Sequence, residues 1–418
     1  MKSKLFTKDF TLLWLGKSVS QLGDGAGFIG LMWWVNQTGS ATALGLMAAV
    51  SSLVRVGLSP FSGALADRIS KKAIIVLMDI CRGLVYLAMG YLAWVGQLNL
   101  FQVIALSAIN TVFSVFFGPA ISSSIPLIVE PENLPRANSF MQMTGIIVQI
   151  VSYSAGGVLV AFIGVPLLLL VNGLSFLLSA ISEAFIFIPT VASAASRRGQ
   201  KFLANIKEGF AYVKEHRVLF DIMKTAAIIN FIGAPLFILL PKFVNEHMQA
   251  SSEMYGYLLA CMAAGTLAAS LLIAFTRVVQ RNVWIVMYGI SIQGMLYIAF
   301  TLLARSTPAI FLTLFFISGM VNGIVNIYFG SLLQRMIARE HMGKVFGLLD
   351  SMSGALQPLS QGMTGMLGDQ IAAGVVYIGA GVLGIGTGVK FSLIPNLRTW
   401  LSPEEKAPAV APAVAADH

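Results

Sequence analysis

Twelve long apolar segments divide this 418-residue chain, and few folds can accommodate them. Each is about 20 residues long, which is the length that a helix needs to cross the hydrocarbon core of a bilayer. Backbone polar groups in a bilayer must bond to one another, so runs of this length favour membrane-spanning helices. The segments lie at residues 10–35, 41–65, 73–95, 100–123, 138–162, 166–189, 224–245, 254–276, 283–304, 309–333, 345–367 and 373–395. The sequence therefore predicts an all-α membrane protein with twelve transmembrane helices.

The composition excludes a soluble protein. Hydrophobic residues make up 57% of the chain and charged residues only 11%, whereas soluble domains carry about 25% charged residues. The net charge of +9 comes from basic residues in the loops. Such loops contact anionic lipid headgroups, so nucleic-acid binding is not expected.

The distribution of basic residues orients the protein in the membrane. With a cytoplasmic N-terminus, 21 of the 27 Lys and Arg residues fall in cytoplasmic segments and only Lys242 and Arg305 fall in outside loops. The other four, Lys17, Arg55, Arg82 and Lys390, lie within the apolar segments. Cytoplasmic loops of membrane proteins are enriched in Lys and Arg. The sequence therefore predicts that both termini are cytoplasmic.

Asp24 lies in the middle of the first apolar segment. A carboxylate at the centre of a membrane helix costs at least about 2.5 kcal/mol, so it is seldom present without a function. Lys17 and Gln21 precede it at helical spacing, so that one helix face can carry all three side chains. Asp24 is the candidate for proton coupling, and the alternative is a structural salt bridge with Lys17 or Arg55.

Further polar residues within the apolar segments define a candidate substrate pathway. Arg55 lies near the middle of the second segment. Asp79 and Arg82 are three residues apart in the third, which predicts a local ion pair near the cytoplasmic side, and Glu183 lies near a helix end that solvent can reach. Each asparagine in the segments is either an interhelical hydrogen-bonding group or a substrate contact. The pathway candidates are Lys17, Gln21, Arg55, Asn110, Asn172, Asn230, Asn322 and Asn326.

The chain divides into two halves that weakly resemble each other. Gly45 and Gly256 begin similar runs in the second and eighth segments, and Asn110 precedes Phe117-Gly118 as Asn322 precedes Phe329-Gly330. Two six-helix pseudo-repeats place a substrate site between them near mid-membrane. The predicted parts are a bundle at 1–190, a cytoplasmic linker with an amphipathic helix at 191–223, a second bundle at 224–396 and a disordered tail at 397–418.

The junction of the second and third segments carries the strongest motif. Gly63 is followed by Asp67-Arg68 and by Lys71-Lys72. Here the chain resembles the major facilitator superfamily, which has a glycine, an Asp-Arg pair and a basic cluster in this loop. The resemblance implies a conformational latch, in which Asp67 caps the helix that begins near Val345 and holds the outward-open state.

Several other runs resemble the macrolide-efflux-like branch, a group of twelve-span drug:proton antiporters of bacterial cytoplasmic membranes. These runs are Ser20 to Asp24, Gln37 to Ala41, Pro126 to Ala137, Lys207 to Gly209 with His216, and Gln334 with Gly343 to Phe346. The fourth segment lacks the arginine of many proton-coupled exporters, and the fifth keeps the paired glycines of the antiporter motif without its Gly-Pro. The sequence therefore leaves open whether the protein is an antiporter and whether protons drive it.

No pattern indicates an enzyme, a cofactor or a metal site. The phosphate-binding Gly-x-x-x-x-Gly-Lys pattern does not occur, and Cys81 and Cys261 have no Cys or His nearby at metal-ligand spacing. The predicted function is secondary active transport, with proton-coupled efflux of small amphipathic drugs or metabolites by a monomer. The alternatives are a transporter for a specific lipid, siderophore or nutrient, and a receptor or assembly factor that does not transport.

Overall fold

The computed structural model of the protein describes residues 6–189, 213–214, 217–275, 283–303, 307–337 and 342–393. Within these ranges the side chains of residues 60, 63–68, 217, 283, 334–336 and 342–353 are outside the description. The predicted disordered tail and most of the predicted linker helix fall outside it as well. Of that linker helix, Val213 is buried and Lys214 is exposed.

The described chain is helical throughout, and each of the twelve predicted segments falls on a helix. The first half contains α1 (Lys8–Thr38), α2 (Ala41–Arg68), α3 (Lys71–Trp94), α4 (Leu100–Ile128), the short 3₁₀ helix η1 (Pro131–Asn133) and α5 (Leu134–Ala184). The second half contains α7 (Arg217–Ile238), α8 (Leu240–Lys242), the short η3 (Phe243–His247), α9 (Ser252–Phe275), α10 (Val283–Leu302), α11 (Pro308–Met336), α12 (Met342–Gln370) and α13 (Ala373–Ser392).

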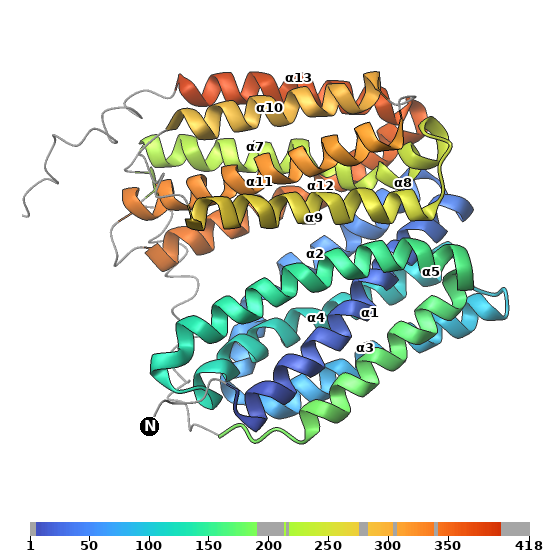
Figure 1. Ribbon diagram of the computed structural model, residues 1–418, viewed down its shortest axis with the longest axis vertical. Coiled ribbons are helices and arrows are strands. Elements are labelled where there is room, and N and C mark those ends of the chain that lie inside the picture. The colour runs from blue at the N-terminus through green and yellow to red at the C-terminus, as the bar shows by residue number, and fades with distance from the viewer. Residues whose placement is uncertain are drawn as a thin grey trace, which may run out of the picture.

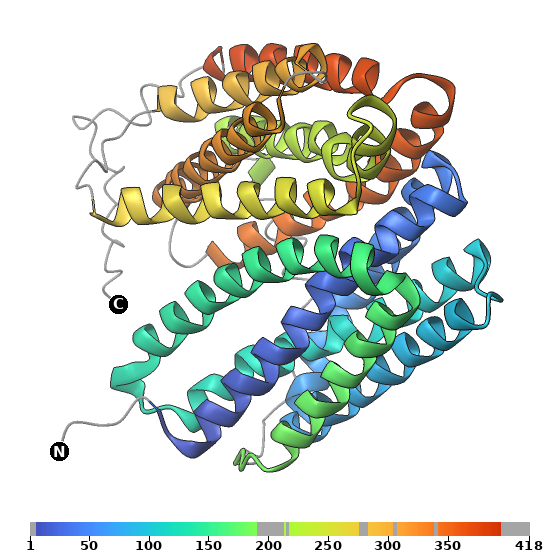
Figure 2. The same cartoon turned by 45° about the vertical axis from the view of Figure 1, so that its right-hand side comes forward.

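Helix α5 supplies two of the predicted segments. Gly164 interrupts it with φ 75° and ψ 165°, a conformation that glycine adopts without steric cost, and Pro166 follows. The chain turns there and returns alongside α1 and α3 (Figure 2). Among the residues that the structure describes, nine helical stretches are long and apolar enough to span a membrane, with α5 counted once. Helices α1 and α12 are outside that set.

Two six-helix bundles meet at one end of the molecule and diverge at the other, where the N-terminus lies (Figure 1). Buried apolar residues follow this shape. One cluster at the meeting end combines residues from both bundles, such as Trp33 and Tyr255, whose rings stack with centroids 6.3 Å apart. At the diverging end each bundle has a separate cluster, around Phe10 in the first and around Met223 in the second. The predicted fold of two six-helix bundles is confirmed.

Close helix contacts seal the meeting end. Helix α2 packs on α12 and α5 packs on α9. A Cβ atom at Gly45 would lie 2.5 Å from the carbonyl oxygen of Gln361, and one at Gly256 would lie 2.4 Å from that of Tyr153. Real Cβ atoms do not approach so closely, so both helix pairs depend on glycine at these positions.

Polar contacts reinforce the same junction. Asp369, in the last turn of α12, accepts hydrogen bonds from the first backbone N–H groups of α2, at 2.7 Å from Ala41 and 3.0 Å from Thr42. A carboxylate at a helix N-terminus is favoured by the helix dipole. Lys242 donates to the carbonyl oxygen of Gly368 at 2.7 Å, and Ser252 donates to that of Gly157 at 3.0 Å. The bonds that Asp369 and Ser252 form join the two halves near the sealed ends of their helices. The bond from Lys242 to Gly368 lies within the second half and fixes α8 against α12.

Candidate functional site

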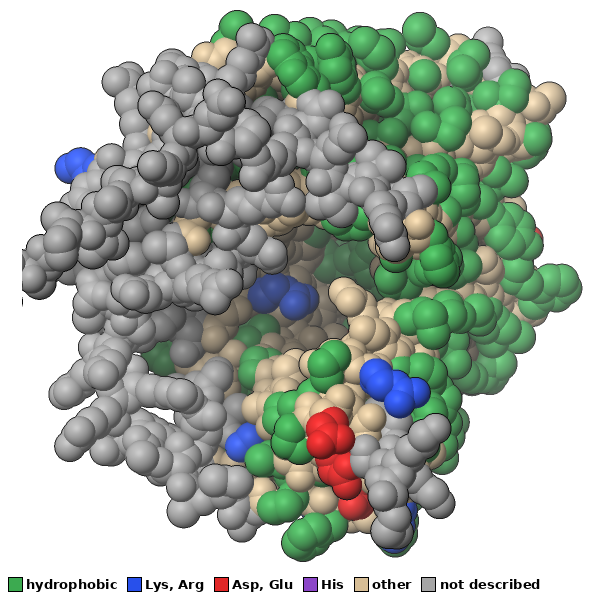
Figure 3. All heavy atoms as spheres, turned by 60° about the vertical axis from the view of Figure 1, so that its left-hand side comes forward, with side chains coloured by type: hydrophobic (Ala, Val, Ile, Leu, Met, Phe, Trp, Pro, Cys, Tyr) green, Lys and Arg blue, Asp and Glu red, His purple; other side chains and the backbone are tan. Residues whose placement is uncertain are grey.

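A cavity of about 720 Å³ lies between the two bundles. Its wall comes mainly from α1, α2, α3, α4 and α5 of the first bundle, while α7 and α12 contribute Phe237, Ile238 and Gln361. Figure 3 looks onto the diverging end and shows a hollow with a basic side chain inside it. The volume is in the range that accommodates drug-sized molecules. The cavity is therefore the candidate substrate site.

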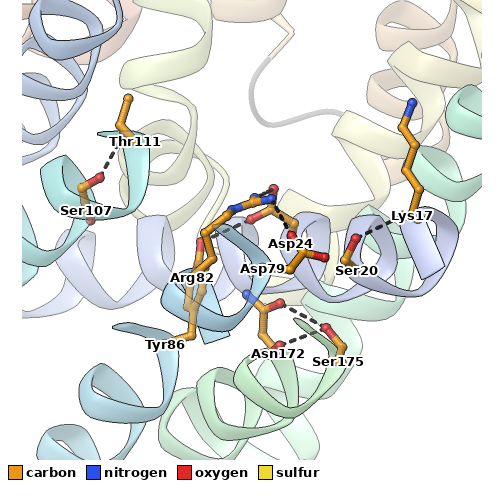
Figure 4. Close-up of polar contacts among 10 residues, drawn as sticks. All are labelled: Lys17, Ser20, Asp24, Asp79, Arg82, Tyr86, Ser107, Thr111, Asn172 and Ser175. Carbon is orange, nitrogen blue, oxygen red and sulfur yellow. Dashed lines mark hydrogen bonds and ion pairs between the residues drawn. The ribbon is translucent and has the colours of Figure 1, made fainter. Parts of the chain in front are cut away.

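Asp24 lies on the cavity wall, where its side chain is 40% exposed. Arg82 of α3 donates from Nη2 to Asp24 Oδ2 at 2.9 Å, and the Tyr86 hydroxyl donates to Oδ1 at 3.2 Å (Figure 4). The partner of Asp24 is thus Arg82 rather than Lys17 or Arg55, so the partners expected from the sequence were wrong, and the role of Asp24 in proton coupling stays a prediction. Lys17 lies two turns earlier on α1, and its ammonium points away from Asp24 (Figure 4). Arg82 reaches Asp24 because α1 and α3 both pack against α5, an arrangement that sequence spacing cannot reveal.

Aromatic rings hold the guanidinium of Arg82 in place. Its Cζ atom lies 4.1 Å from the centroid of the Phe176 ring and 5.6 Å from that of Phe117. Phe176 also stacks on Tyr86. Cation–π contacts of this kind strengthen when the cation is desolvated, and Arg82 is only 5% exposed. The Asp24–Arg82 pair is therefore anchored on its buried side and open to the cavity on the other.

Glycines beside Asp24 allow α1 to approach α5. A Cβ atom at Gly23 would lie 2.1 Å from Ser175 Oγ, and one at Gly27 would lie 2.4 Å from Asn172 Nδ2. Only a helix with glycine on this face can pack so closely. Near Asp24, helix α1 therefore packs one face on α5 and exposes another face to the cavity.

Two more carboxyl groups lie behind Arg82. Arg82 Nη1 is 3.6 Å from Asp79 Oδ1, so the predicted ion pair is present. Asp79 is 0% exposed and Glu183 is 1% exposed, and their four carboxyl oxygens have no hydrogen-bond partner among the described residues. The expectation that solvent reaches Glu183 was wrong, because α1 covers it: a Cβ atom at Gly16 would lie 3.2 Å from Glu183 Cγ. Asp79 and Glu183 are close enough to interact electrostatically.

Lys17, Gln21 and Arg55 all line the cavity, as predicted for a pathway. Within the described part of the chain, neither Lys17 nor Arg55 forms an ion pair. The cavity wall therefore carries two cationic groups without an acidic partner there, together with one acid that Arg82 neutralises.

The structure separates the predicted asparagines. Asn110 lines the cavity, and its buried Oδ1 has no partner among the described residues. Asn172 bonds with Ser175, Asn230 donates to the carbonyl of Ala226, and Asn326 donates to Asn322, each within its own helix. Asn172 also interacts with Tyr86 of α3, as expected for an interhelical contact, whereas no interhelical bond of Asn230 or Asn326 is among the described contacts. A helical side chain can reach the carbonyl four residues earlier more easily than a neighbouring helix. Asn322 lines a separate small cavity of about 60 Å³ in the second bundle.

The predicted latch lies at the diverging end. Gly63, Asp67 and Arg68 occupy the last turns of α2, and their side chains fall outside the described residues, as do those of α12 near Val345. Lys71 and Lys72 begin α3 and are half-buried. The role of this latch stays a prediction.

Sequence reasoning missed three residues that the structure brings into play. Tyr86 follows Arg82 by one helical turn, so the shared face of α3 could have revealed it. Phe176 and Asp369 act through neighbours far away in the sequence. No local pattern marks these two.

Comparison with known proteins agrees with this geometry. The sequence profile of the Major Facilitator Superfamily matches residues 13–360. The chain is 24% identical over 401 residues to the uncharacterized MFS-type transporter YvqJ of Bacillus subtilis, covering 94% of each chain. It is 22% identical over 390 residues to macrolide efflux protein A of Streptococcus pyogenes, covering 93% of this chain and 96% of the relative. It is 23% identical over 394 residues to the multidrug efflux pump Tap of Mycobacterium bovis, covering 90% of this chain and 91% of the relative.

Solved structures share the arrangement of helices. A bacterial homologue of the iron transporter ferroportin in an inward-facing state has a TM-score of 0.71 at 15% identity, covering 94% of this chain and 98% of its own. The nucleoside transporter NupG has a TM-score of 0.72 at 14% identity, covering 92% of this chain and 98% of its own. At these identities the likeness concerns the fold alone.

Proposed function

This chain belongs to the Major Facilitator Superfamily, and from that premise we propose that it exports small amphipathic compounds in exchange for protons. It is a multi-pass membrane protein and a secondary transporter rather than an enzyme. Transporters built from two such repeats expose a central site first to one side of the membrane and then to the other. The proposal concerns the coupling ion, the direction and the substrate.

One observation carries the proton coupling: an acid on the cavity wall shares its cation with a buried acid. Arg82 lies 2.9 Å from Asp24 and 3.6 Å from Asp79. Water in the cavity can reach Asp24, whereas Asp79 is fully buried. Protonation of Asp24 removes its charge and frees Arg82 to move toward Asp79. This movement alters the link between α1 and α3, which both pack on α5, and so couples proton binding to conformation.

The direction of transport follows from the proposed orientation. With both termini in the cytoplasm, as the basic residues predict, the diverging end faces the cytoplasm of a bacterium and the sealed end faces outward. The cavity is then open on the side from which an exporter loads its substrate. Two of the relatives are named as efflux proteins, which supports export. Single cysteines replacing Gln97, between α3 and α4, and Glu132 in η1 test the orientation: an impermeant reagent should label position 97 from outside and position 132 only from inside.

The coupling is tested with the Asp24→Asn variant in proteoliposomes. A panel of fluorescent amphiphiles of negative, zero and positive charge is offered with and without a pH gradient. We expect Asp24→Asn to lower gradient-driven transport to the rate of empty liposomes while passive exchange of the same compound persists. Asp221→Asn is the matched control, because Asp221 is an acid at the beginning of α7 that pairs with the exposed Lys224. Wild-type gradient-driven rates in Asp24→Asn would rule out Asp24 as the coupling site.

The alternative is a transporter for a specific lipid, siderophore or nutrient on the same scaffold. This alternative is favoured if the wild-type protein transports none of the fluorescent amphiphiles but does transport one such compound. The direction of that transport relative to the pH gradient then distinguishes uptake from export.

A further inference from the structure

The charges on the cavity wall are not balanced. Four charged residues line it, and three of them are cations: Lys17, Arg55 and Arg82. Asp24, the fourth, accepts hydrogen bonds from both Arg82 and Tyr86. No described acidic side chain pairs with Lys17 or Arg55. Two positive charges in a partly desolvated cavity attract an anion more strongly than the same charges in water.

The unpaired cations share one end of the cavity. Helix α1 begins at the diverging end, and Lys17 lies about two turns after Phe10, near that end. At 1.5 Å per residue, Phe28 lies about 16 Å further along the same helix, toward the sealed end. Helix α2 runs in the opposite direction, so Arg55 lies about 12 Å closer to the diverging end than Met47. Both cations are therefore near the opening, one on each of two neighbouring helices.

The opposite end of the cavity is apolar. Phe28, Met32, Met47, Phe237 and Ile238 line it near the sealed junction. Phe28 and Tyr153 lie with ring centroids 6.2 Å apart and form an aromatic part of the wall. An occupant of this cavity thus meets cations at the opening and apolar side chains at the closed end.

We propose that the substrate is an amphiphile with an anionic headgroup, which lies between Lys17 and Arg55 while its apolar portion extends toward Phe28 and Met47. This inference rests on the proposed transport function and names the substrate class of that same cavity. Arg82 takes no direct part, because Asp24 already occupies it. A cationic amphiphile, by contrast, would place a third positive charge between Lys17 and Arg55.

Binding of three probes with one tail tests the class of headgroup. The full-length protein in phosphatidylcholine nanodiscs is titrated with dansyl-undecanoate, with its neutral primary amide and with the analogue that ends in trimethylammonium. Empty nanodiscs correct for partition into lipid. We expect the carboxylate to bind about tenfold more tightly than the other two, because a charge-assisted hydrogen bond forms only with the anion. Equal affinity for the three probes, or a preference for the cation, would overturn the proposal.

Variants locate the headgroup. Lys17→Gln and Arg55→Gln should each weaken carboxylate binding about tenfold and leave amide binding within about twofold. Lys17→Arg and Arg55→Lys keep the charge and should bind as wild type, which separates lost charge from misfolding. Lys8→Gln is the matched control, because Lys8 is an exposed basic residue of the same helix as Lys17 and does not line the cavity. Unchanged carboxylate binding in the Lys17→Gln/Arg55→Gln double variant would also refute the proposal.

Two further arms separate the sources of the anion and the underlying function. Competition by phosphatidylglycerol in the nanodisc would assign the site to a lipid headgroup, and its absence would assign it to a free amphiphile; both support an anion site. Gradient-driven transport of the cationic probe alone would retain the transporter and overturn the substrate class. Tight anion binding without transport of any probe would retain the class and overturn the proposed function.

Discussion

The two six-helix bundles share a fold but differ in the side chains that they place at mid-membrane depth. In the first bundle an acid–arginine–acid cluster and two further cations surround the cavity. Among the described side chains of the second bundle, the polar groups at this depth are neutral amides, such as Gln293, which donates to Ser318 at 2.7 Å. Described charged side chains of the second bundle, such as Asp221, Lys242 and Asp369, lie near helix ends. The fold is repeated, whereas the charged chemistry belongs to one copy.

The bundles are alike where they meet. Gly45 of α2 faces Gly365 of α12, and Gly256 of α9 faces Gly157 of α5. Gly45 and Gly256 are the residues whose similar surroundings suggested an internal repeat. The repeat therefore has a physical basis at the junction, since both bundles need close backbone contact there, but it does not extend to the charges in the cavity.

The largest effect on stability is expected from removing Arg82, the cation that Asp24 and Asp79 share. Arg82→Met leaves Asp24 and the fully buried Asp79 without their shared partner. Removing one partner of a buried ion pair costs about 3–5 kcal/mol of stability. Because Asp24 is partly exposed, we expect the cost of Arg82→Met to lie at the lower end of that range. We expect a clear drop in the apparent melting temperature of the purified protein and partial recovery in Arg82→Met/Asp79→Asn.

Gln293→Met in the second bundle is the matched control. Gln293 also bonds to a side chain of a neighbouring helix, but no charge is left unpaired when it is removed. Interhelical bonds of this kind contribute about 0.6 kcal/mol in membrane proteins. If Arg82→Met and Gln293→Met lowered the melting temperature equally, the charged cluster of the first bundle would contribute no more to stability than the neutral bond of the second.

A smaller effect is expected at the junction, and there it should be the same for both bundles. Gly45→Ala and Gly256→Ala each place a Cβ atom within 2.5 Å of a backbone oxygen, so the helices must separate. Overpacking costs about 1–3 kcal/mol, which disfavours the conformation sealed at this end. Spin labels at positions 132 and 224, on opposite bundles at the diverging end, should report a shift toward shorter distances.

The matched controls are the glycines of the second repeat pair. Gly118→Ala and Gly330→Ala face open space, because a Cβ atom at either position has no neighbour within 4 Å. We expect both to keep the wild-type distance distribution. A shift in only one of the two junction variants would mean that the glycine pairs are not equivalent.

The sequence by itself determined the helices, their number and the chemical types present at the site. Segments of about 20 apolar residues can satisfy their backbone only as helices in a bilayer, so segment length alone predicted where α1 to α13 lie. Asp24 stood out for the same reason, since an ionisable group in such a segment is costly wherever it points. The same argument named eight candidates for the substrate pathway, of which Lys17, Gln21, Arg55 and Asn110 line the cavity and the other four asparagines do not.

Only the tertiary structure decided which groups act together. The partner of Asp24 is Arg82, 58 positions away, rather than Lys17 on the same helix. Glu183 is buried because Gly16 lets α1 cover it, although its place near a helix end suggested exposure. The cap of α2 by Asp369 joins groups more than 300 positions apart. Apolar length is a property of each segment, whereas these contacts depend on how helices are arranged around one another, and interhelical packing in a membrane is set by small residues and side-chain shape that leave little periodic trace in the sequence.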